Sequence, residues 1–190
     1  DVWAHPELFK LDKELRPVKV AGVPPDYFSK TGQLWGNPIY DWEAHEKEGF
    51  RWWTQRLESA FLLYDIIRID HFRGIDRYYE IPAFAEDGPK EKLFAGIANK
   101  DNIIAEDLGV IDEGVAALRS ELGFPGMKVL LFAFDGNEEN EFLPRNITED
   151  SVCYTGTHDN DTVAGYVKSL STEEFLLFRS RVATSLAEEG

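Results

Sequence analysis

The spacing of apolar residues predicts several amphipathic helices along this chain. Between residues 41 and 64, apolar side chains recur at every third or fourth position, which places them on one stripe of a helix. A further predicted helix ends at Gly123, and another begins at Ser171, which forms a capping box with Glu174. The helices are predicted over residues 41–64, 89–100, 112–123 and 171–189.

Short apolar runs lie between these helices and predict β-strands. Three of the four runs are apolar along nearly their whole length, which is typical of strands buried on both faces of a parallel sheet. The alternation of strand and helix favours an α/β fold with helices on the outer face of the sheet. An open doubly wound sheet suits the pattern too, but the phosphate-binding loops GxGxxG and GxxxxGKS/T do not occur. The strands are predicted over residues 64–70, 102–107, 127–135 and 151–157.

The first forty residues are rich in proline, glycine and aromatic rings, and we predict a long ordered loop there. Proline and glycine at this density disfavour a helix or a central strand. Long ordered loops in compact domains usually serve function or packing.

Charge and cysteine content narrow the classes of partner and compartment. The 190 residues include 35 acidic and 20 basic side chains, a formal charge of −15, which repels nucleic acid and anionic membrane surfaces. Neither is therefore an expected partner. The single cysteine, Cys153, excludes an intrachain disulfide and lies in an apolar run, so we expect a buried thiol and a reducing compartment such as the cytoplasm.

The strand predicted over residues 64–70 ends in charged residues. Side chains alternate along a strand, so Arg68 and Asp70 share a face, about 6.6 Å apart at a rise of about 3.3 Å per residue. The guanidinium favours the ionised carboxylate, and an ionised carboxylate held at the end of a strand suits a nucleophile. A structural pair of arginine and aspartate that orients a loop remains an equal alternative.

Two later strands also end in acids. Glu106 and Asp107 point to opposite faces, so one can face a site while the other caps the next turn. A glutamate that leaves an apolar strand is partly desolvated, which raises its pKa and suits a general acid. His158, Asp159 and Asp161 follow the last predicted strand. Alternation separates His158 from Asp159 unless the chain turns there, and the sequence leaves their directions open.

Acids at the carboxyl ends of separate parallel strands meet at the edge of the sheet where ligands bind. One ionised and one protonated carboxyl group is the arrangement that glycoside chemistry needs. The rings of Tyr27, Phe28 and Trp35 suit sugar faces, although packing is the commoner role of an aromatic ring. His71 and His158 each neighbour an aspartate, but no HxxxH, HxH or CxxC spacing supports a metal site.

Five segments carry a family resemblance: AGVPPDYFSKTGQLWGNP, RIDHFRG, AEDLGV, GMKVLLFAFD and YTGTHDND. In this order they resemble the 4-alpha-glucanotransferases, or amylomaltases, of glycoside hydrolase family 77 in the alpha-amylase clan, whose catalytic core is a (β/α)8 barrel. The resemblance implies that residues 1–190 are a fragment of one barrel domain, a partial (β/α)8 TIM barrel of about four strand-helix repeats. Residues 1–41 would form a substrate-loop region, and residues 42–190 would hold family strands four to seven.

The resemblance implies catalytic roles for three carboxylates. Asp70 would be the nucleophile that forms a covalent glucosyl-enzyme, Glu106 the general acid and then base, and Asp159 the carboxylate that stabilises the transition state. The implied reaction transfers a segment of an alpha-1,4-glucan to the 4-hydroxyl of another glucan with retention of configuration. No cofactor or metal is expected.

The resemblance also implies contacts with alpha-1,4-glucans and maltooligosaccharides. Arg68 and His158 resemble the family's residues that contact the nucleophile and the donor sugar. Tyr27 and Phe28 fall in the loop that overhangs the acceptor side, and Trp35 is a further candidate for substrate binding.

Two alternatives remain open, a hydrolase of the same clan and a non-catalytic glucan-binding fragment. A complete barrel needs about 250 residues, so we expect half a barrel to have little or no activity. Such a piece exposes sheet edges and barrel interior, and we expect it to pair with itself or to leave segments mobile.

Overall fold

The structure is a computed structural model. It describes residues 1–25, 29–81, 84–87, 90–95, 97–98, 100–109 and 111–188. The chain forms two compact units, Asp1–Phe124 and Pro125–Gly190, and each is described by itself. Helices and strands alternate in both units, which agrees with the predicted α/β class.

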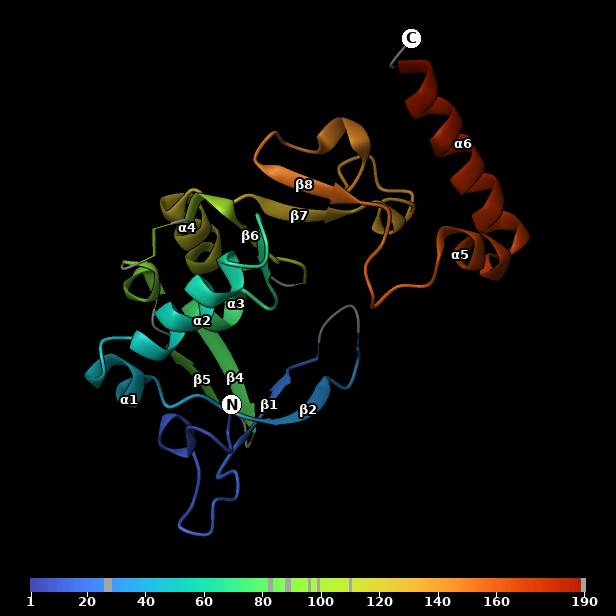
Figure 1. Cartoon of the computed structure of the whole chain (residues 1–190). Coiled ribbons are helices and arrows are strands. Elements are labelled where there is room, and N and C mark those ends of the chain that lie inside the picture. Colours follow the sequence, from blue (N-terminus) through green and yellow to red (C-terminus); the bar gives the residue numbers. More distant parts are fainter. Residues whose placement is uncertain are drawn as a thin grey trace. The chain divides into compact units, whose positions relative to one another are not determined.

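The first unit contains an antiparallel sheet with the strand order β2-β1-β4-β5 (Figure 1). The prediction of a loop over the first forty residues is therefore wrong in part, because β1 and β2 form a hairpin there. The prolines do not prevent pairing, since β2 is an edge strand and Pro38 is its last residue. The strands are β1 (Val20–Val23), β2 (Gln33–Pro38), β4 (Arg77–Ile81) and β5 (Phe84–Asp87).

Glu80 on β4 is a fully buried acid of this sheet. Its carboxylate accepts a hydrogen bond of 3.1 Å from Lys10 Nζ and forms a second ion pair with Lys19. Both lysines precede β1 in the chain, so the ion pairs of the buried acid connect the N-terminal segment to the sheet.

A pair of parallel strands stands apart from this sheet. Strand β3 (Ile67–Ile69) pairs with β6 (Ile103–Ala105), and Ile69 lies opposite Ala105. Both strands fall inside their predicted ranges, but each is shorter than predicted. Ile69, Ile103 and Ala105 are buried, as expected for strands of a parallel sheet.

The helix predicted over residues 41–64 is two helices, α1 (Trp42–Lys47) and α2 (Arg51–Phe61). Gly49 and Phe50 between them have positive φ angles of 71° and 52°, which a continuous right-handed helix cannot contain. Buried His45 of α1 lies among aromatic rings, 5.4 Å from Tyr40 and 5.2 Å from Trp42 between ring centroids.

The remaining helices of the first unit are α3 (Arg73–Asp76) and α4 (Glu113–Leu122). Asp112 caps α4 by accepting from the Val115 amide, and Gly123 ends it in the left-handed conformation, as predicted. The region predicted as a helix over residues 89–100 contains 3-10 turns instead, where the structure describes it. The 3-10 segments of this unit are Pro6–Leu8, Lys90–Phe94 and Lys100–Asn102.

Three phenylalanines form the centre of the first unit's core. Phe72 lies 6.3 Å from Phe94 and 5.9 Å from Phe124 between ring centroids, and Phe94 lies 5.0 Å from Phe124. All three side chains are almost fully buried. Phe72 follows β3 by three residues, so the core anchors the chain just beyond this strand.

The second unit contains a parallel pair, β7 (Gly126–Val129) and β8 (Ser151–Tyr154). Helix α5 (Val163–Ser169) and helix α6 (Thr172–Glu188) follow, and α6 runs to the C-terminal end (Figure 1). The predicted capping box is present, because the Ser171 amide donates to Glu174 and the Glu174 amide donates to Ser171. The 3-10 segments of this unit are Leu130–Phe132 and Pro144–Asn146.

The prediction of a buried thiol at Cys153 is wrong, because the side chain is exposed. Cys153 lies opposite Lys128 in the parallel register, and Lys128 forms an ion pair with Glu141. The face of the β7–β8 pair that carries Cys153 and Lys128 is therefore polar. Among the described helices, none has the length and apolar character needed to cross a membrane.

Candidate active site

Arg68 and Asp70 form the predicted ion pair at the end of β3. Arg68 Nη2 lies 2.6 Å from Asp70 Oδ1, and the Asp70 side chain is 67% exposed. The guanidinium holds one carboxylate oxygen while most of the group stays open to solvent. This arrangement leaves a carboxylate that an incoming ligand can reach.

Asp70 and Glu106 each come directly after the last residue pair of the parallel strands β3 and β6. Ile69 pairs with Ala105, and the Glu106 amide donates to the Ile69 carbonyl at 3.0 Å, so the ladder continues one step beyond the strands. Residues at one level of a parallel pair point to the same face, which places both acids on one side. Two carboxyl groups therefore emerge together at the carboxyl edge of this strand pair.

The environments of the two acids differ. The Glu106 residue is buried, and this burial raises the pKa of its carboxyl group, as predicted. Hydrogen bonds from the amides of Leu108 and His71 oppose the shift, the charge of Asp70 adds to it, and that of Arg68 opposes it. Burial is the largest effect, so Glu106 retains a proton to higher pH than an ordinary glutamate.

A bend at His71 supplies one of these amides. His71 has a positive φ of 49°, unusual for a residue with a side chain. Its amide donates to Glu106 Oε2 at 2.7 Å, and the Leu108 amide donates to Glu106 Oε1 at 2.7 Å. The Glu106 carbonyl accepts instead from the Phe72 amide at 3.0 Å. Both carboxylate oxygens are thereby fixed by backbone donors.

Asp107 points away from Glu106 and binds a helix. Its Oδ2 lies 3.2 Å from Arg119 Nε of α4, and its side chain is only 9% exposed. The sequence predicts that one acid faces the site and the other caps the next turn. In the structure Glu106 faces the site and also caps the next turn, because its Oε1 accepts a hydrogen bond from the Leu108 amide.

Trp35 of β2 reaches this site through His71. The two rings meet edge to face with centroids 4.7 Å apart, and Trp35 remains 43% exposed. Burial lowers the pKa of His71, which favours the neutral imidazole. Tyr27 and Phe28, the other predicted aromatic contacts, lie outside the described residues.

His158 and Asp159 follow β8 in the second unit. His158 Nε2 lies 3.4 Å from Asp159 Oδ2, and both side chains are exposed. Strand alternation would separate them, but the chain turns after the strand. The Asp159 amide donates to Thr157 Oγ1 at 3.2 Å, and the Asn160 amide donates to the Thr157 carbonyl at 3.1 Å.

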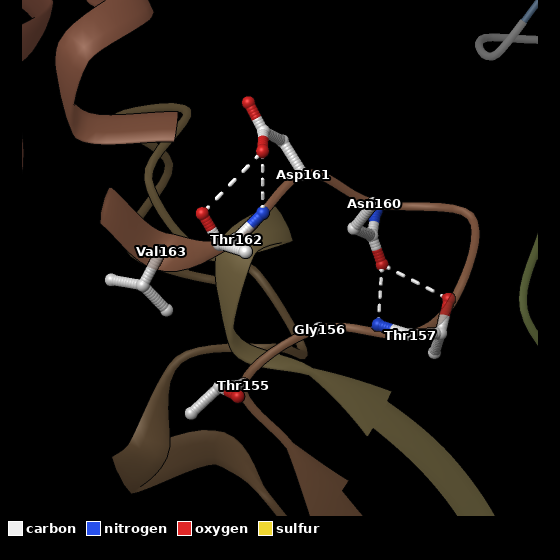
Figure 2. A pocket seen from close by; sticks show the side chains of 7 residues that line it. All are labelled: Thr155, Gly156, Thr157, Asn160, Asp161, Thr162 and Val163. Atoms are coloured by element: carbon white, nitrogen blue, oxygen red, sulfur yellow. Dashed lines mark hydrogen bonds between the residues drawn. The ribbon is translucent and has the colours of Figure 1, made fainter. Parts of the chain in front are cut away.

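The same loop encloses a small polar hollow of about 150 Å³ (Figure 2). Asn160 Oδ1 accepts from both the amide and the hydroxyl of Thr157, and Asp161 Oδ1 accepts from the Thr162 amide. Asp161 therefore serves the entry to α5, whose N-cap is Thr162, while Asp159 is free of this role. The lining residues are Thr155, Gly156, Thr157, Asn160, Asp161, Thr162 and Val163.

The structure thus brings the predicted residues together in two groups. Arg68, Asp70 and Glu106 meet in the first unit, and His158 meets Asp159 in the second. Convergence of the two groups on one sugar ring stays a prediction. Within the described part of the chain, no three or more histidine, cysteine or acidic side chains form a group that could hold a metal ion.

The amides of His71 and Leu108 are the site groups that sequence reasoning missed. Side-chain type identifies candidate acids but says nothing about which backbone N–H groups will face them. One signal was present, because Gly109 follows Leu108 and has a φ of 97°, a conformation that favours glycine. A glycine two residues after the acidic pair indicates a tight turn in which the Leu108 amide can point back toward Glu106.

Comparison with known proteins shows that the chain is similar to part of several 4-alpha-glucanotransferases. A 4-alpha-glucanotransferase from Thermus thermophilus is 54% identical over an alignment of 203 positions, which covers 100% of this chain and 40% of that protein. The 4-alpha-glucanotransferase of Clostridium butyricum is 49% identical over 92% of this chain and 38% of its own length. The chain therefore spans about two fifths of these relatives.

Solved structures agree with the sequence comparison. An amylomaltase from Streptococcus agalactiae in complex with acarbose matches with a TM-score of 0.86 and 43% identity, over 93% of this chain and 38% of that chain. An amylomaltase from Corynebacterium glutamicum, 22% identical, has a TM-score of 0.68 over 90% of this chain and 26% of that chain, and so supports the fold. The family model described as 4-alpha-glucanotransferase matches residues 1–189, and the chain belongs to this family, glycoside hydrolase family 77.

Proposed function

We propose that this chain is the part of a 4-alpha-glucanotransferase that carries its three catalytic carboxylates, within a partial (β/α)8 barrel. In the complete enzyme it would transfer segments of alpha-1,4-glucans between glucan chains. The parallel pairs β3–β6 and β7–β8 support an arrangement of barrel strands. The relative solved with acarbose supports a site for glucan-like ligands.

The first half-reaction breaks the donor glucan. Asp70 attacks the anomeric carbon, and a bond forms between its carboxylate oxygen and that carbon. Glu106 gives its proton to the glycosidic oxygen, which leaves with the reducing-end part of the glucan. The accessible Asp70 carboxylate and the raised pKa of Glu106 suit these roles.

The second half-reaction rebuilds a glycosidic bond. Glu106, now ionised, takes the proton from the 4-hydroxyl of an acceptor glucan. The acceptor oxygen attacks the anomeric carbon from the opposite side, and the bond to Asp70 breaks. Two inversions at one carbon give net retention, and both acids return to their starting protonation states.

The other candidates bind and orient the sugar. Asp159 and His158 are exposed at the end of β8, where they can contact hydroxyl groups of a donor glucose. Trp35 keeps nearly half of its surface open beside His71 and can stack on a sugar face. Tyr27 and Phe28 complete the proposed acceptor side.

A single observation carries the proposal. Asp70 and Glu106 directly follow Ile69 and Ala105, the last residue pair of one parallel ladder, yet one acid is open and paired with arginine while the other is buried. An accessible carboxylate for the nucleophile and a carboxyl group with a raised pKa for the general acid are what double displacement requires. A fragment that only binds glucan has no need of this difference.

The test is a chimera in which residues 1–190 replace the matching segment of the Thermus thermophilus relative. On maltotriose, transfer gives longer maltooligosaccharides, whereas hydrolysis gives only glucose and maltose. Asp70→Asn and Glu106→Gln should each lower kcat by at least about 10³-fold, the order of magnitude for loss of a unit of catalytic machinery. The control Asp65→Asn changes an exposed acid before β3 and should leave kcat within twofold.

Two outcomes would contradict the proposal. Full activity in the Asp70→Asn variant would show that Asp70 is not the nucleophile. Hydrolysis products alone would favour a hydrolase of the same clan. We further propose that the 190-residue chain alone has little or no transferase activity, because transition-state stabilisation depends on groups that must be positioned together. Turnover of maltotriose by this chain near that of an intact relative would refute the second statement.

A further inference from the structure

Gly74 contacts the bend that holds Glu106. It lies in helix α3 and its amide donates to the His71 carbonyl at 2.8 Å. A Cβ atom at position 74 would lie 3.2 Å from His71 Cδ2 and 3.9 Å from Nε2. The first distance is shorter than an ordinary carbon–carbon contact, so the imidazole must shift by a few tenths of an ångström to admit a side chain at position 74.

Backbone conformation does not explain the glycine. Gly74 is not among the residues with positive φ, and alanine is a better helix former than glycine. The strained conformation instead belongs to His71, whose φ is 49°. A residue with a side chain keeps such a conformation only where its surroundings hold it. The surroundings of the His71 ring include Gly74 and the Trp35 ring.

We propose that Gly74 is a positioning residue for Glu106. Its missing side chain leaves room for the His71 ring, the seated ring fixes the bend, and the bend aims the His71 amide at Glu106 Oε2. The chain of contacts is continuous, since the ring lies against Gly74 and the amide lies 2.7 Å from the carboxylate. The inference deepens the proposed function and rests on it for the role of Glu106.

The charged groups that face Glu106 are Asp70 and Arg68, both on the neighbouring strand end. Neither side chain lies within 4 Å of a Cβ atom placed at Gly74. A change at Gly74 therefore reaches Glu106 through the His71 bend rather than through these charges. Lengthening the amide–carboxylate bond removes a donor that favours the ionised form, so the Glu106 pKa should rise further.

The experiment is a double-mutant cycle on the 190-residue chain, with Gly74→Ala, His71→Gly and the combined variant. The titration of the Glu106 carboxyl group is followed by ¹³C NMR. Its signal is assigned by its disappearance in the Glu106→Gln variant. The hydrogen bond is followed through the ¹H shift of the residue 71 amide. We expect Gly74→Ala to move the Glu106 midpoint to higher pH and the amide proton upfield. In the His71→Gly background, the same substitution should change neither, because no ring is displaced.

Two results would overturn the proposal. One is an unchanged Glu106 midpoint and amide shift in Gly74→Ala, and the other is the same shift in both backgrounds. A purely structural role predicts only a change in stability, and alanine in a helix would raise it. If Gly74→Ala prevented folding, His71→Gly should restore it, and failure to restore it would also end the proposal.

The cycle needs no turnover, so it is independent of the transferase assay. A chimera without activity would leave the NMR result intact, and an unchanged titration would leave the proposed function intact. In an active chimera, Gly74→Ala should move the alkaline limb of the kcat profile to higher pH, since this limb reports ionisation of the general acid.

Discussion

Replacing Phe72 by alanine tests whether the core of the first unit anchors the strand end that carries Asp70. The Phe72 ring is fully buried and lies about 6 Å from the rings of Phe94 and Phe124. A buried phenylalanine removes roughly 200 Å² from water, which at about 25 cal/mol per Å² corresponds to about 5 kcal/mol. Alanine keeps part of this, and we expect a loss of about 3–5 kcal/mol in the free energy of unfolding.

The assay is urea unfolding followed by tryptophan fluorescence. With a slope of about 2 kcal/mol per M, a loss of about 4 kcal/mol lowers the midpoint by about 2 M. The matched control is Leu62→Ala, which truncates a side chain that is 86% exposed and should stay within about 0.5 kcal/mol. A loss below about 1 kcal/mol in Phe72→Ala would refute the reasoning, because it would show that this ring is not part of a close-packed core.

Further predictions concern pH and ion pairs, and each is checked by unfolding experiments. Burial raises the pKa of Glu106, so the protonated group stabilises the fold below the ordinary value of 4.5, and this stabilisation is lost as pH rises through the pKa in the folded state. Glu106→Gln should therefore reduce the change in the free energy of unfolding over this pH range. Burial lowers the pKa of His45, so stability should fall as pH drops through the ordinary value of 6.5, and His45→Phe should remove that loss. Glu80→Ala breaks a buried ion pair with two lysines and should cost about 3 kcal/mol, whereas Glu14→Ala at an exposed pair should cost less than about 1 kcal/mol. Equal costs for the two variants would contradict the assigned difference in burial.

The strands that carry the candidate site were predictable because buried parallel strands have a strong composition signal. The run that includes Ile103–Ala105 is short and apolar, the run that includes Ile67–Ile69 is rich in isoleucine, and the structure places β6 and β3 there. Their ends were less predictable, because the polar residues beyond each strand continue the ladder through single hydrogen bonds. The hairpin of β1 and β2 was missed, since proline and glycine mark loops on average but are tolerated on an edge strand.

The break between α1 and α2 shows another limit of periodicity. Apolar residues continue at helical spacing through Gly49 and Phe50, because both helices bury the same kind of stripe. Spacing reports which side chains are buried and not whether the backbone between them is continuous. A glycine followed by an aromatic residue with positive φ breaks the hydrogen-bond ladder without disturbing the pattern.

In the candidate site, strand alternation predicted which acids share a face but could not predict how they differ. Arg68 and Asp70 pair as their spacing requires, because both lie on one face of one strand. The raised pKa of Glu106 followed from its apolar strand. The role of Asp107 was not predictable, because it depends on Arg119, which is twelve residues further along the chain.

One irregularity, the left-handed bend at His71, separates the surroundings of Glu106 from those of a regular parallel ladder. In a regular parallel ladder the two acids would be equivalent, each at the end of its strand with similar access to water. The left-handed bend at His71 folds the chain after β3 over Glu106 and turns its amide onto the Glu106 carboxylate, while Asp70 stays on the open side beside Arg68. The bend therefore gives Glu106 a backbone donor on the buried side of the strand end. A glutamine at Glu106 would test this account structurally, since its amide group cannot accept from both backbone donors, and the His71 or Leu108 amide should then lose its bond.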